Sequence, residues 1–319
     1  MKPTRQVTAV LLMAAFTAVG CTKRDTPSTT AQESRDSAQA KPVAAVSELP
    51  PLAGTDEEGF VKDTTPKVKG PASFADGEAA YKAKNYTEAA TIFEDYTTQK
   101  PGNAWGHFML GLSTWKAGDL DKSQKAFETA LTLDPDHLKS LLNLSRVLID
   151  KKQYDDAINT LMRAGDLEPN STDVYRLLGR AYHAQGKTDD AVDAYTRAIE
   201  LDDKDAWSMN NLGLVLLEKK RADDALPLFA KAVELKKDVA VFHNNLGMAL
   251  EHTGRFTAAA TAYGNAVTAD PAFDKAKQNL ARVDAVKKGP EEPFDVETTA
   301  KGATKDAPAT AEDTKTASK

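Results

Sequence analysis

Small and apolar residues recur along this chain with a period of 34 residues, and mostly polar positions separate them. Three lines of residues stay in register when the sequence is shifted by one period. The first is mostly glycine and consists of Gly77, Gly111, Ser145, Gly179, Gly213 and Gly247. The second is mostly alanine and consists of Ala89, Ser123, Ala157, Ala191, Ala225 and Ala259. The third carries Pro101, Pro135, Pro169 and Pro271. A fixed period of this length predicts stacked pairs of helices.

Each period is predicted to fold as helix A, a turn, helix B and a second turn. Thr or Asp at one repeat position is predicted to cap helix B, because these side chains accept hydrogen bonds from free amides of a first helical turn. These residues are Thr87, Asp121, Asp155, Asp189, Asp223 and Thr257. The preceding turn carries Gly118, Gly186 and Gly254 in alternate units, where glycine adopts the left-handed conformation at little cost. Large helix B residues are predicted to fill the core at Phe93, Phe127, Leu161, Tyr195, Phe229 and Tyr263.

The period, the leucine–glycine pairs, the alanines and the closing prolines together resemble the tetratricopeptide repeat (TPR). The resemblance covers six units, at residues 70–103, 104–137, 138–171, 172–205, 206–239 and 240–273, with a capping helix at 274–288. It implies an all-α superhelical solenoid of six helix-turn-helix repeats, in which the A helices line a concave groove. We therefore place the TPR domain at residues 72–288. The pattern encodes packing, so it predicts a binding scaffold without naming the partner.

The first 20 residues are predicted to be a signal peptide. A basic start precedes a short apolar run from Val7 to Val19, which is shorter than the roughly 20 residues that a transmembrane helix needs. The sequence Ala-Val-Gly-Cys that ends at Cys21 resembles the lipobox of bacterial lipoproteins. That resemblance implies that Cys21 is diacylated and anchors the protein; a chance cysteine after an ordinary signal peptide is the alternative. Thr22 stands where aspartate would resemble an inner-membrane retention signal, which favours the outer membrane, facing the periplasm.

Residues 21–71 and 289–319 are predicted to be disordered. They are rich in small, polar and charged residues and hold too few apolar side chains to offset the entropy lost on ordering. The first segment would be a lipid-anchored linker of about 50 residues, with an r.m.s. reach of roughly 40 Å. Within the second, PEEPFDVE is predicted either to visit the protein's own groove or to be a solvated tail.

Composition argues against several kinds of chemistry. The net charge is −6, and a chain this acidic is a poor general binder of nucleic acid. The single cysteine, Cys21, excludes an intrachain disulfide and a CxxC metal site. No nucleotide-binding glycine loop, GxSxG elbow or HExxH motif occurs, and the histidines lack metal-ligand spacing. We therefore predict no catalytic residue, no metal site, no cofactor and no nucleic-acid partner.

The predicted groove changes in character along the repeats. Its first part is apolar and largely aromatic, at Phe74, Tyr81, Trp105, Phe108, Leu112 and Trp115. Phe108 and Trp115 are predicted to be exposed anchors, because aromatic side chains dominate binding energies. Its middle part is basic, at Lys139, Arg146, Arg176 and Arg180. Its last part carries Asn210, Asn211, Asn244 and Asn245, which suit a peptide backbone because asparagine both donates and accepts hydrogen bonds. Core packing of the aromatics and a solvated face for the arginines are the alternatives.

These features predict a non-catalytic adaptor that binds a segment of an envelope protein. A segment with apolar anchors and an acidic portion fits the change from aromatic to basic residues. Bacterial lipoproteins of similar build include pilotins for pilus secretins, outer-membrane assembly subunits and adaptors for peptidoglycan hydrolases. Two alternatives are a glycan-binding or enzymatic groove, and a structural spacer that self-associates through its aromatic end.

Overall fold

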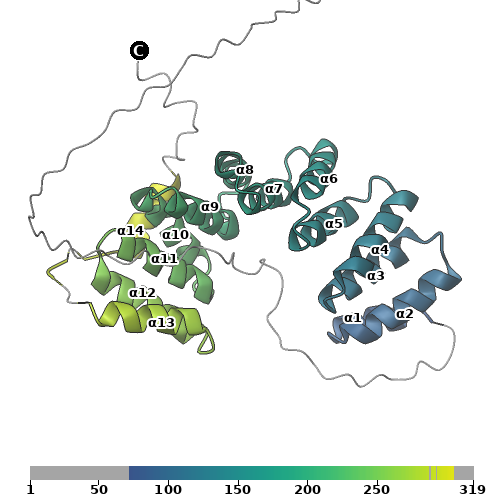
Figure 1. Ribbon diagram of the computed structural model, residues 1–319, viewed down its shortest axis with the longest axis horizontal. Helices are drawn as coiled ribbons and strands as arrows, with labels where there is room; N and C mark the ends of the chain where they lie inside the picture. The colour runs from purple at the N-terminus through teal and green to yellow at the C-terminus, as the bar shows by residue number, and fades with distance from the viewer. Residues whose placement is uncertain (1–71, 287–288, 292, 305–319) are drawn as a thin grey trace, which may run out of the picture. The chain divides into compact units, whose positions relative to one another are not determined.

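The computed structural model describes residues 72–286, 289–291 and 293–304, which all lie within one compact unit, Glu48–Lys319. The predicted signal peptide, Cys21, the linker and residues 305–319 lie outside the described residues. Every regular element of the described part is helical, which confirms the predicted all-α class (Figure 1). Among these helices, none combines the length and the hydrophobicity needed to cross a membrane.

The helices form six hairpins that keep the predicted period. The A helices are α1 (Phe74–Lys82), α3 (Ala104–Lys116), α5 (Leu138–Asp150), α7 (Thr172–Ala184), α9 (Ala206–Glu218) and α11 (Ala240–His252). The B helices are α2 (Tyr86–Gln99), α4 (Leu120–Leu133), α6 (Tyr154–Leu167), α8 (Thr188–Leu201), α10 (Ala222–Leu235) and α12 (Phe256–Ala269). After them come α13 (Asp274–Asp284), α14 (Val296–Ala300) and the short 3-10 helix η1 (Lys301–Thr304). From α3 onward each A helix begins 34 residues after the previous one.

In five hairpins an aromatic ring of helix B lies against a glycine of helix A. A Cβ added to Gly213 would lie 2.7 Å from the ring of Phe229, which is fully buried. The other four pairs are Gly77 with Phe93, Gly111 with Phe127, Gly179 with Tyr195, and Gly247 with Tyr263. The glycine line therefore exists because helix A must present bare backbone to a ring in a close-packed core.

The remaining hairpin, α5–α6, shows that these two positions change together. Helix A carries Ser145 in the glycine line, and helix B carries Leu161 where the others carry an aromatic residue. Both residues are fully buried, and Ser145 Oγ donates a hydrogen bond to the Leu142 carbonyl at 2.7 Å. The serine side chain is accommodated where the ring is replaced by the smaller leucine.

All six turns between helix A and helix B close in the same way. The backbone φ angle is 77–88° at Gly118, Gly186 and Gly254, which confirms the predicted left-handed conformation. In the other units the same conformation is adopted by Lys84, Lys152 and Lys220, with φ of 60–62°. The next amide then donates to the carbonyl five residues earlier, as Gln153 does to Leu148 at 2.8 Å. This Schellman closure supplies a partner to an otherwise free helix-end carbonyl.

The N-cap of each helix B lies two residues before the predicted cap, so that prediction was wrong. The N-cap of α4 is Asp119, whose side chain accepts from the Lys122 amide at 3.0 Å. The residues predicted as caps, from Thr87 to Thr257, lie at the second position of their helices. A carboxylate there, such as that of Asp155, interacts favourably with the positive end of the helix dipole without capping it. Because the acids were interpreted as caps, each helix B was predicted to begin two residues too late.

Part of the tail that was predicted to be disordered is helical. The segments α14 and η1 pack against α10, and Ala300 is fully buried. Phe294 and Val296 pack on the same apolar cluster as α10 and α12. Amino-acid composition does not predict that this segment is ordered, because its apolar residues are few. They nevertheless all pack on one surface of the repeats. The segment contacts a B helix, which corrects both alternatives predicted for it, a visit to the groove of the A helices and a solvated tail.

We expect Gly213→Ser to lower the free energy of unfolding by about 1–3 kcal/mol, because the added side chain would collide with the Phe229 ring. The double variant Gly213→Ser/Phe229→Leu copies the Ser145–Leu161 pair and should lose less than the sum of its two single changes. Urea unfolding followed by circular dichroism supplies the four free energies of this cycle. Additivity of the two changes within error would contradict the proposed coupling.

Candidate functional site

Consecutive A helices contact one another along the domain. The contacting pairs run from α1 with α3 to α9 with α11, whereas no two B helices of the described part make comparable contact. We use the term A-helix face for the side chains of α3, α5, α7, α9 and α11 that lie toward neighbouring A helices. Side-chain contacts on this face join residues that are about one period apart.

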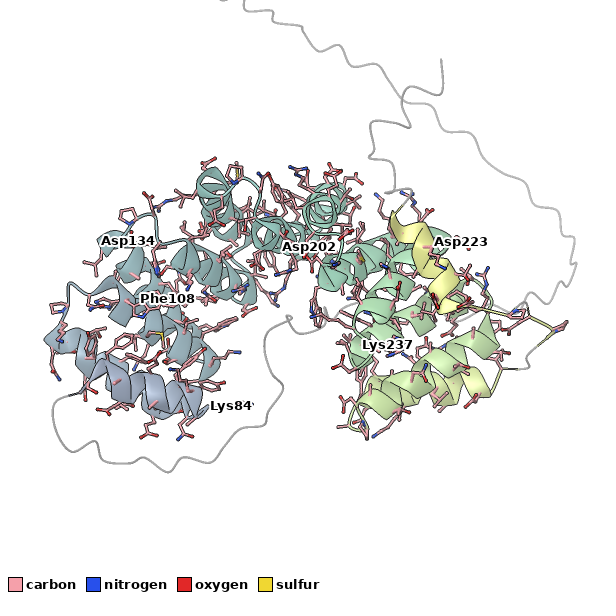
Figure 2. The ribbon with its side chains drawn as sticks, turned by 180° about the vertical axis from the view of Figure 1, so that it is seen from behind. Lys84, Phe108, Asp134, Asp202, Asp223 and Lys237 are labelled. Carbon is pink, nitrogen blue, oxygen red and sulfur yellow. The ribbon has the colours of Figure 1, made fainter. Side chains whose placement is uncertain are left out.

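The first part of the A-helix face is aromatic, but it contains only one strongly exposed ring among the described residues. Trp105 is 41% exposed. Phe108, which is labelled in Figure 2, lies one turn later on α3. It is 4% exposed. The Phe108 ring packs 5.9 Å from Phe127 and 5.0 Å from the ring of His137. The prediction that Phe108 is an exposed anchor was therefore wrong, because α4 and the start of α5 enclose it. Lys139 lies with its Nζ 5.3 Å from the centre of the Trp105 ring.

The other apolar residues predicted for this part are half-buried. The Phe74 ring lies 5.4 Å from Phe93, and the Tyr81 ring lies 5.3 Å from Tyr86. Burial raises the pKa of the Tyr81 hydroxyl from its ordinary value. Leu112 is also half-buried. Phe74 and Tyr81 thus pack within the first hairpin, as the core-packing alternative anticipated.

Asp150 organises the centre of the A-helix face. Trp115 Nε1 donates to Asp150 Oδ2 at 3.0 Å, and Arg180 Nη2 donates to Asp150 Oδ1 at 3.1 Å. One carboxylate at the end of α5 therefore holds side chains from α3 and α7. Sequence analysis missed Asp150 as a site residue. The available signal was its spacing of one period plus one residue from Trp115, which recurs in the bond between His183 and Glu218 at 2.9 Å.

Two residues of the predicted basic stretch, Arg176 and Arg180, are paired with carboxylates instead of being free. Arg176 Nη1 donates to Asp205 Oδ2 at 2.9 Å, and Arg176 also pairs with Asp173. Burial lowers the pKa of the Arg180 guanidinium, and the neighbouring Asp150 opposes that shift. Burial likewise lowers the pKa of Arg146, whose Nη1 donates to Asn143 Oδ1 at 3.0 Å. Of the four predicted cations, Lys139 alone is exposed.

Three of the four predicted ligand-binding asparagines are buried and bond to one another. Asn210, Asn244 and Asn245 are 0%, 1% and 4% exposed, and Asn211 is half-buried. Asn245 Nδ2 donates to Asn210 Oδ1 at 2.9 Å, and Asn279 Nδ2 donates to Asn244 Oδ1 at 2.9 Å. The prediction that these three are open to a ligand is corrected, since the stacking of α9, α11 and α13 brings them together. They form an amide ladder between the last repeats and the capping helix.

The described residues contain no group of three or more His, Cys, Asp or Glu side chains that could hold a metal ion.

The repeat geometry agrees with a known family. A family model described as the cilia and flagella-associated protein 70 C-terminal domain matches residues 30–319. The chain belongs to this TPR family. The matched residues begin after Cys21, so membership concerns the repeats and leaves the lipobox as a prediction. No curated protein matches the chain.

Solved structures support the same fold for this member of the TPR family. TTC0263, a thermophilic TPR protein of Thermus thermophilus, is 20% identical, with a TM-score of 0.50, over 58% of this chain and 100% of its own. The APC/C hetero-tetramer Cut9–Hcn1 has a TM-score of 0.57 at 19% identity, over 66% of this chain and 41% of that one. These likenesses confirm the predicted TPR-type repeats and concern the fold alone.

We expect Asn245→Ala to lower the free energy of unfolding by about 2–3 kcal/mol, because it leaves the buried Asn210 Oδ1 without its donor and removes the oxygen that accepts from Asn244 Nδ2. The matched control is Asn143→Ala at the same repeat position. Asn143 is partly exposed, and both of its bonds stay within its own helix: it donates to the Lys139 carbonyl at 2.7 Å and accepts from Arg146 Nη1 at 3.0 Å. Its loss should cost under about 1 kcal/mol. Urea unfolding compares the two; equal losses would contradict the structural role of the ladder.

Proposed function

We propose that this chain is a non-catalytic adaptor that binds a segment of another protein on its A-helix face. The observation that carries the proposal is Trp105, the aromatic residue of that face whose ring is most open among those described. The rings of Phe108 and His137 pack against the indole, with ring centres 4.9 and 5.4 Å from its own. A large exposed ring on a rigid base is typical of a binding hot spot.

The environment of Trp105 indicates the chemistry of the partner. An aromatic or aliphatic side chain would pack on the indole, and a carboxylate beside it would meet the exposed ammonium group of Lys139. Farther along the face, Arg176 and Arg180 already pair with Asp150, Asp173 and Asp205, and Arg146 donates to Asn143. The acidic part of the partner is therefore assigned to Lys139, close to the apolar anchor, instead of to the arginines.

We further assign the protein to the outer membrane, facing the periplasm, with a lipid on Cys21 as its anchor. The lipobox-like sequence that ends at Cys21 supports this assignment, and the long polar segment after it would give the repeats reach from the lipid surface. The partner would then be an envelope protein, in a complex for pilus secretion, outer-membrane assembly or peptidoglycan remodelling.

We expect Trp105→Ala to weaken capture of the partner roughly thirtyfold, which corresponds to about 2 kcal/mol for a hot-spot side chain. The bait is residues 22–319, crosslinked to envelope membranes of the source organism, with captured proteins measured by quantitative mass spectrometry. Trp207→Ala is the matched control, because Trp207 has the same repeat position and a similar lysine contact but is only partly exposed. Capture of the same proteins by Trp105→Ala at the wild-type level would refute the role of the A-helix face.

We expect Cys21→Ser to move the protein from the membrane fraction to the soluble fraction, because the thiol that accepts the lipid is lost. Fractionation of cells and mass spectrometry of the mature N-terminus measure this directly. Thr22→Ser is the control and should stay with the membrane. A Cys21→Ser protein that remains in the membrane fraction would rule out the lipid anchor without affecting the binding proposal.

A further inference from the structure

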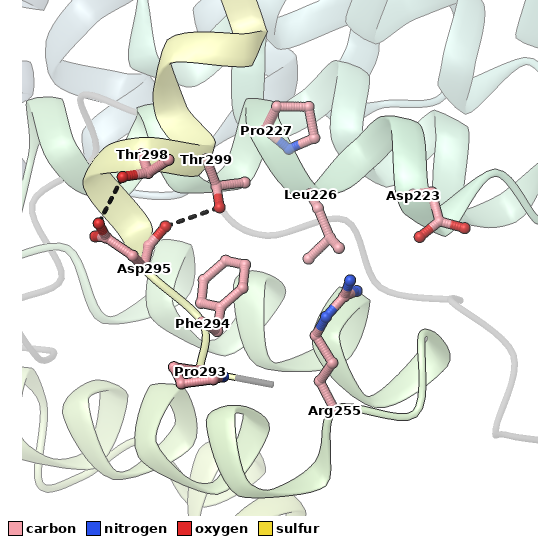
Figure 3. Close-up of a pocket in the computed structure, with 9 residues that line it drawn as sticks. All are labelled: Asp223, Leu226, Pro227, Arg255, Pro293, Phe294, Asp295, Thr298 and Thr299. Carbon is pink, nitrogen blue, oxygen red and sulfur yellow. Dashed lines mark hydrogen bonds between the residues drawn. The ribbon is translucent and has the colours of Figure 1, made fainter. Parts of the chain in front are cut away.

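A cavity of about 420 Å³ lies between α10, the start of α12 and the C-terminal segment that contains α14 (Figure 3). Its apolar walls are Leu226 and Pro227 of α10 and Phe294 of the segment. Asp223, at the start of α10, and Arg255, at the start of α12, add one charge of each sign. This volume and a few polar groups beside apolar walls are typical of a small-molecule site.

Asp223 lacks the partner that its repeat position has in the three preceding units. There, the acid at this position accepts a hydrogen bond from a side chain 30 residues later, in the next repeat. These bonds join Asp121 to Lys151, Asp155 to Gln185, and Asp189 to Lys219. For Asp223 the equivalent residue is Thr253, whose hydroxyl donates to the Leu250 carbonyl of α11 instead, at 3.0 Å. Among the described residues, the Asp223 carboxylate therefore has no hydrogen-bond or ion-pair partner.

Arg255 lacks a partner for a similar reason. Arg221 occupies the same repeat position at the start of α10, and its Nε donates to Asp224 Oδ2 at 2.7 Å. The residue equivalent to Asp224 is Ala258, so α12 offers Arg255 no carboxylate there. Within the described part of the chain, the half-buried Arg255 side chain makes no hydrogen bond or ion pair. Two bonds made in earlier units are thus missing here, and each leaves a charge at the same cavity.

Two other acids of this region are already bonded. Both carboxylate oxygens of Glu291 accept from the Thr257 amide at the start of α12, at 2.9 and 3.0 Å. The Asp295 carboxylate accepts from the Thr298 hydroxyl at 2.6 Å and from the Glu297 amide at 3.0 Å. A ligand in the cavity therefore meets two unpaired charges of opposite sign.

Pro227 leaves one more hydrogen-bonding group unused. In a regular α-helix, the residue at this position donates its amide to the carbonyl four residues earlier, which is that of Asp223. Proline lacks the amide hydrogen, so the Asp223 carbonyl receives no such bond. Because Asp223 and Pro227 both line the cavity, a carboxylate and a carbonyl acceptor belong to one residue of its wall. Two such acceptors suit an ammonium group, which has three donors.

We propose that this cavity binds an apolar α-amino acid in its zwitterionic form. Arg255 binds the carboxylate, because a guanidinium presents paired N–H donors to two oxygens. The carboxylate and carbonyl of Asp223 accept from the ammonium group. Leu226 and Phe294 pack against the apolar side chain, and Figure 3 shows Arg255 and Phe294 extending toward Leu226. The site is built on B helices, so it is separate from the A-helix face and from the partner proposed for that face.

The test is isothermal titration calorimetry of the full-length chain with L-leucine and with relatives that each lack one feature. L-leucinamide lacks the carboxylate, N-acetyl-L-leucine lacks the ammonium group, and glycine lacks the apolar side chain. We expect each charge-deficient relative to bind roughly tenfold more weakly than L-leucine, because it loses a hydrogen bond to a charged group. Glycine should also bind more weakly. Equal affinity for all four, or no binding of L-leucine and L-phenylalanine at millimolar concentration, would overturn the proposal.

Variants of the two charged residues assign the ends of the ligand. Arg255→Gln should weaken L-leucine about tenfold but leave L-leucinamide unchanged, because the amide has no carboxylate to lose. Asp223→Asn should weaken L-leucine by a similar factor and leave N-acetyl-L-leucine unchanged. The matched controls are Arg221→Gln and Asp189→Asn, at the same repeat positions but with partners, and they should change neither affinity. Equal losses for L-leucine and L-leucinamide in Arg255→Gln would show a structural effect and would contradict the site.

A third variant tests the free carbonyl. Pro227→Ala returns an amide hydrogen to α10, so the Asp223 carbonyl gains its helix bond. We expect the urea midpoint of unfolding to rise while the affinity for L-leucine falls severalfold. A raised midpoint with unchanged affinity would remove the Asp223 carbonyl from the site.

Discussion

The domain depends on one contact in each hairpin, the packing of a helix B side chain against helix A where helix A has little or no side chain. In five hairpins the pair is glycine and an aromatic ring, and in α5–α6 it is Ser145 and Leu161. This contact sets how closely the two helices approach. Because the hairpins share it, residues one period apart occupy equivalent environments. The A helices then stack so that residues 35 apart meet, as Trp115 meets Asp150 and Asn210 meets Asn245.

The fold could be predicted because the glycine, alanine and proline lines encode this packing directly. The period predicted the hairpins, and the glycines predicted the conformation of three of the six turns. The pattern could not predict the exact start of helix B, because an acid is favourable at the second helical position as well as at the cap. The prediction that the tail is disordered was wrong for a different reason. Its ordering depends on a surface formed by α10, about 70 residues earlier in the chain, and by the start of α12, 34 residues before Glu291. The composition of the tail alone does not contain that information.

The positions of the site residues on the A helices could be predicted from the sequence, but the exposure of their side chains could not. Trp105 and Phe108 are both aromatic residues of α3, but whether a ring is open depends on the neighbouring helix, and His137 at the start of α5 covers Phe108. The arginines were identified correctly as A-helix residues. Their positive charge was predicted to be available to a ligand, because the carboxylates that pair with Arg180 and Arg176, Asp150 and Asp205, lie about 30 residues away in sequence. A rule that pairs residues one period plus one apart would have found Asp150. It would also have shown that the asparagines satisfy one another.

The last repeats show how a stack of similar units can end without leaving an unsatisfied surface. On the A-helix side, Asn279 of α13 continues the amide ladder, and Arg282 pairs with Glu251 of α11. On the B-helix side, α12 lacks the first-turn acid of the other B helices, and Glu291 provides a substitute. The A-side contacts come from an 11-residue helix, and the B-side contacts come from a much shorter segment. The two sides therefore close the stack by different means, a full helix on the A side and a short C-terminal segment packed against α10 on the B side.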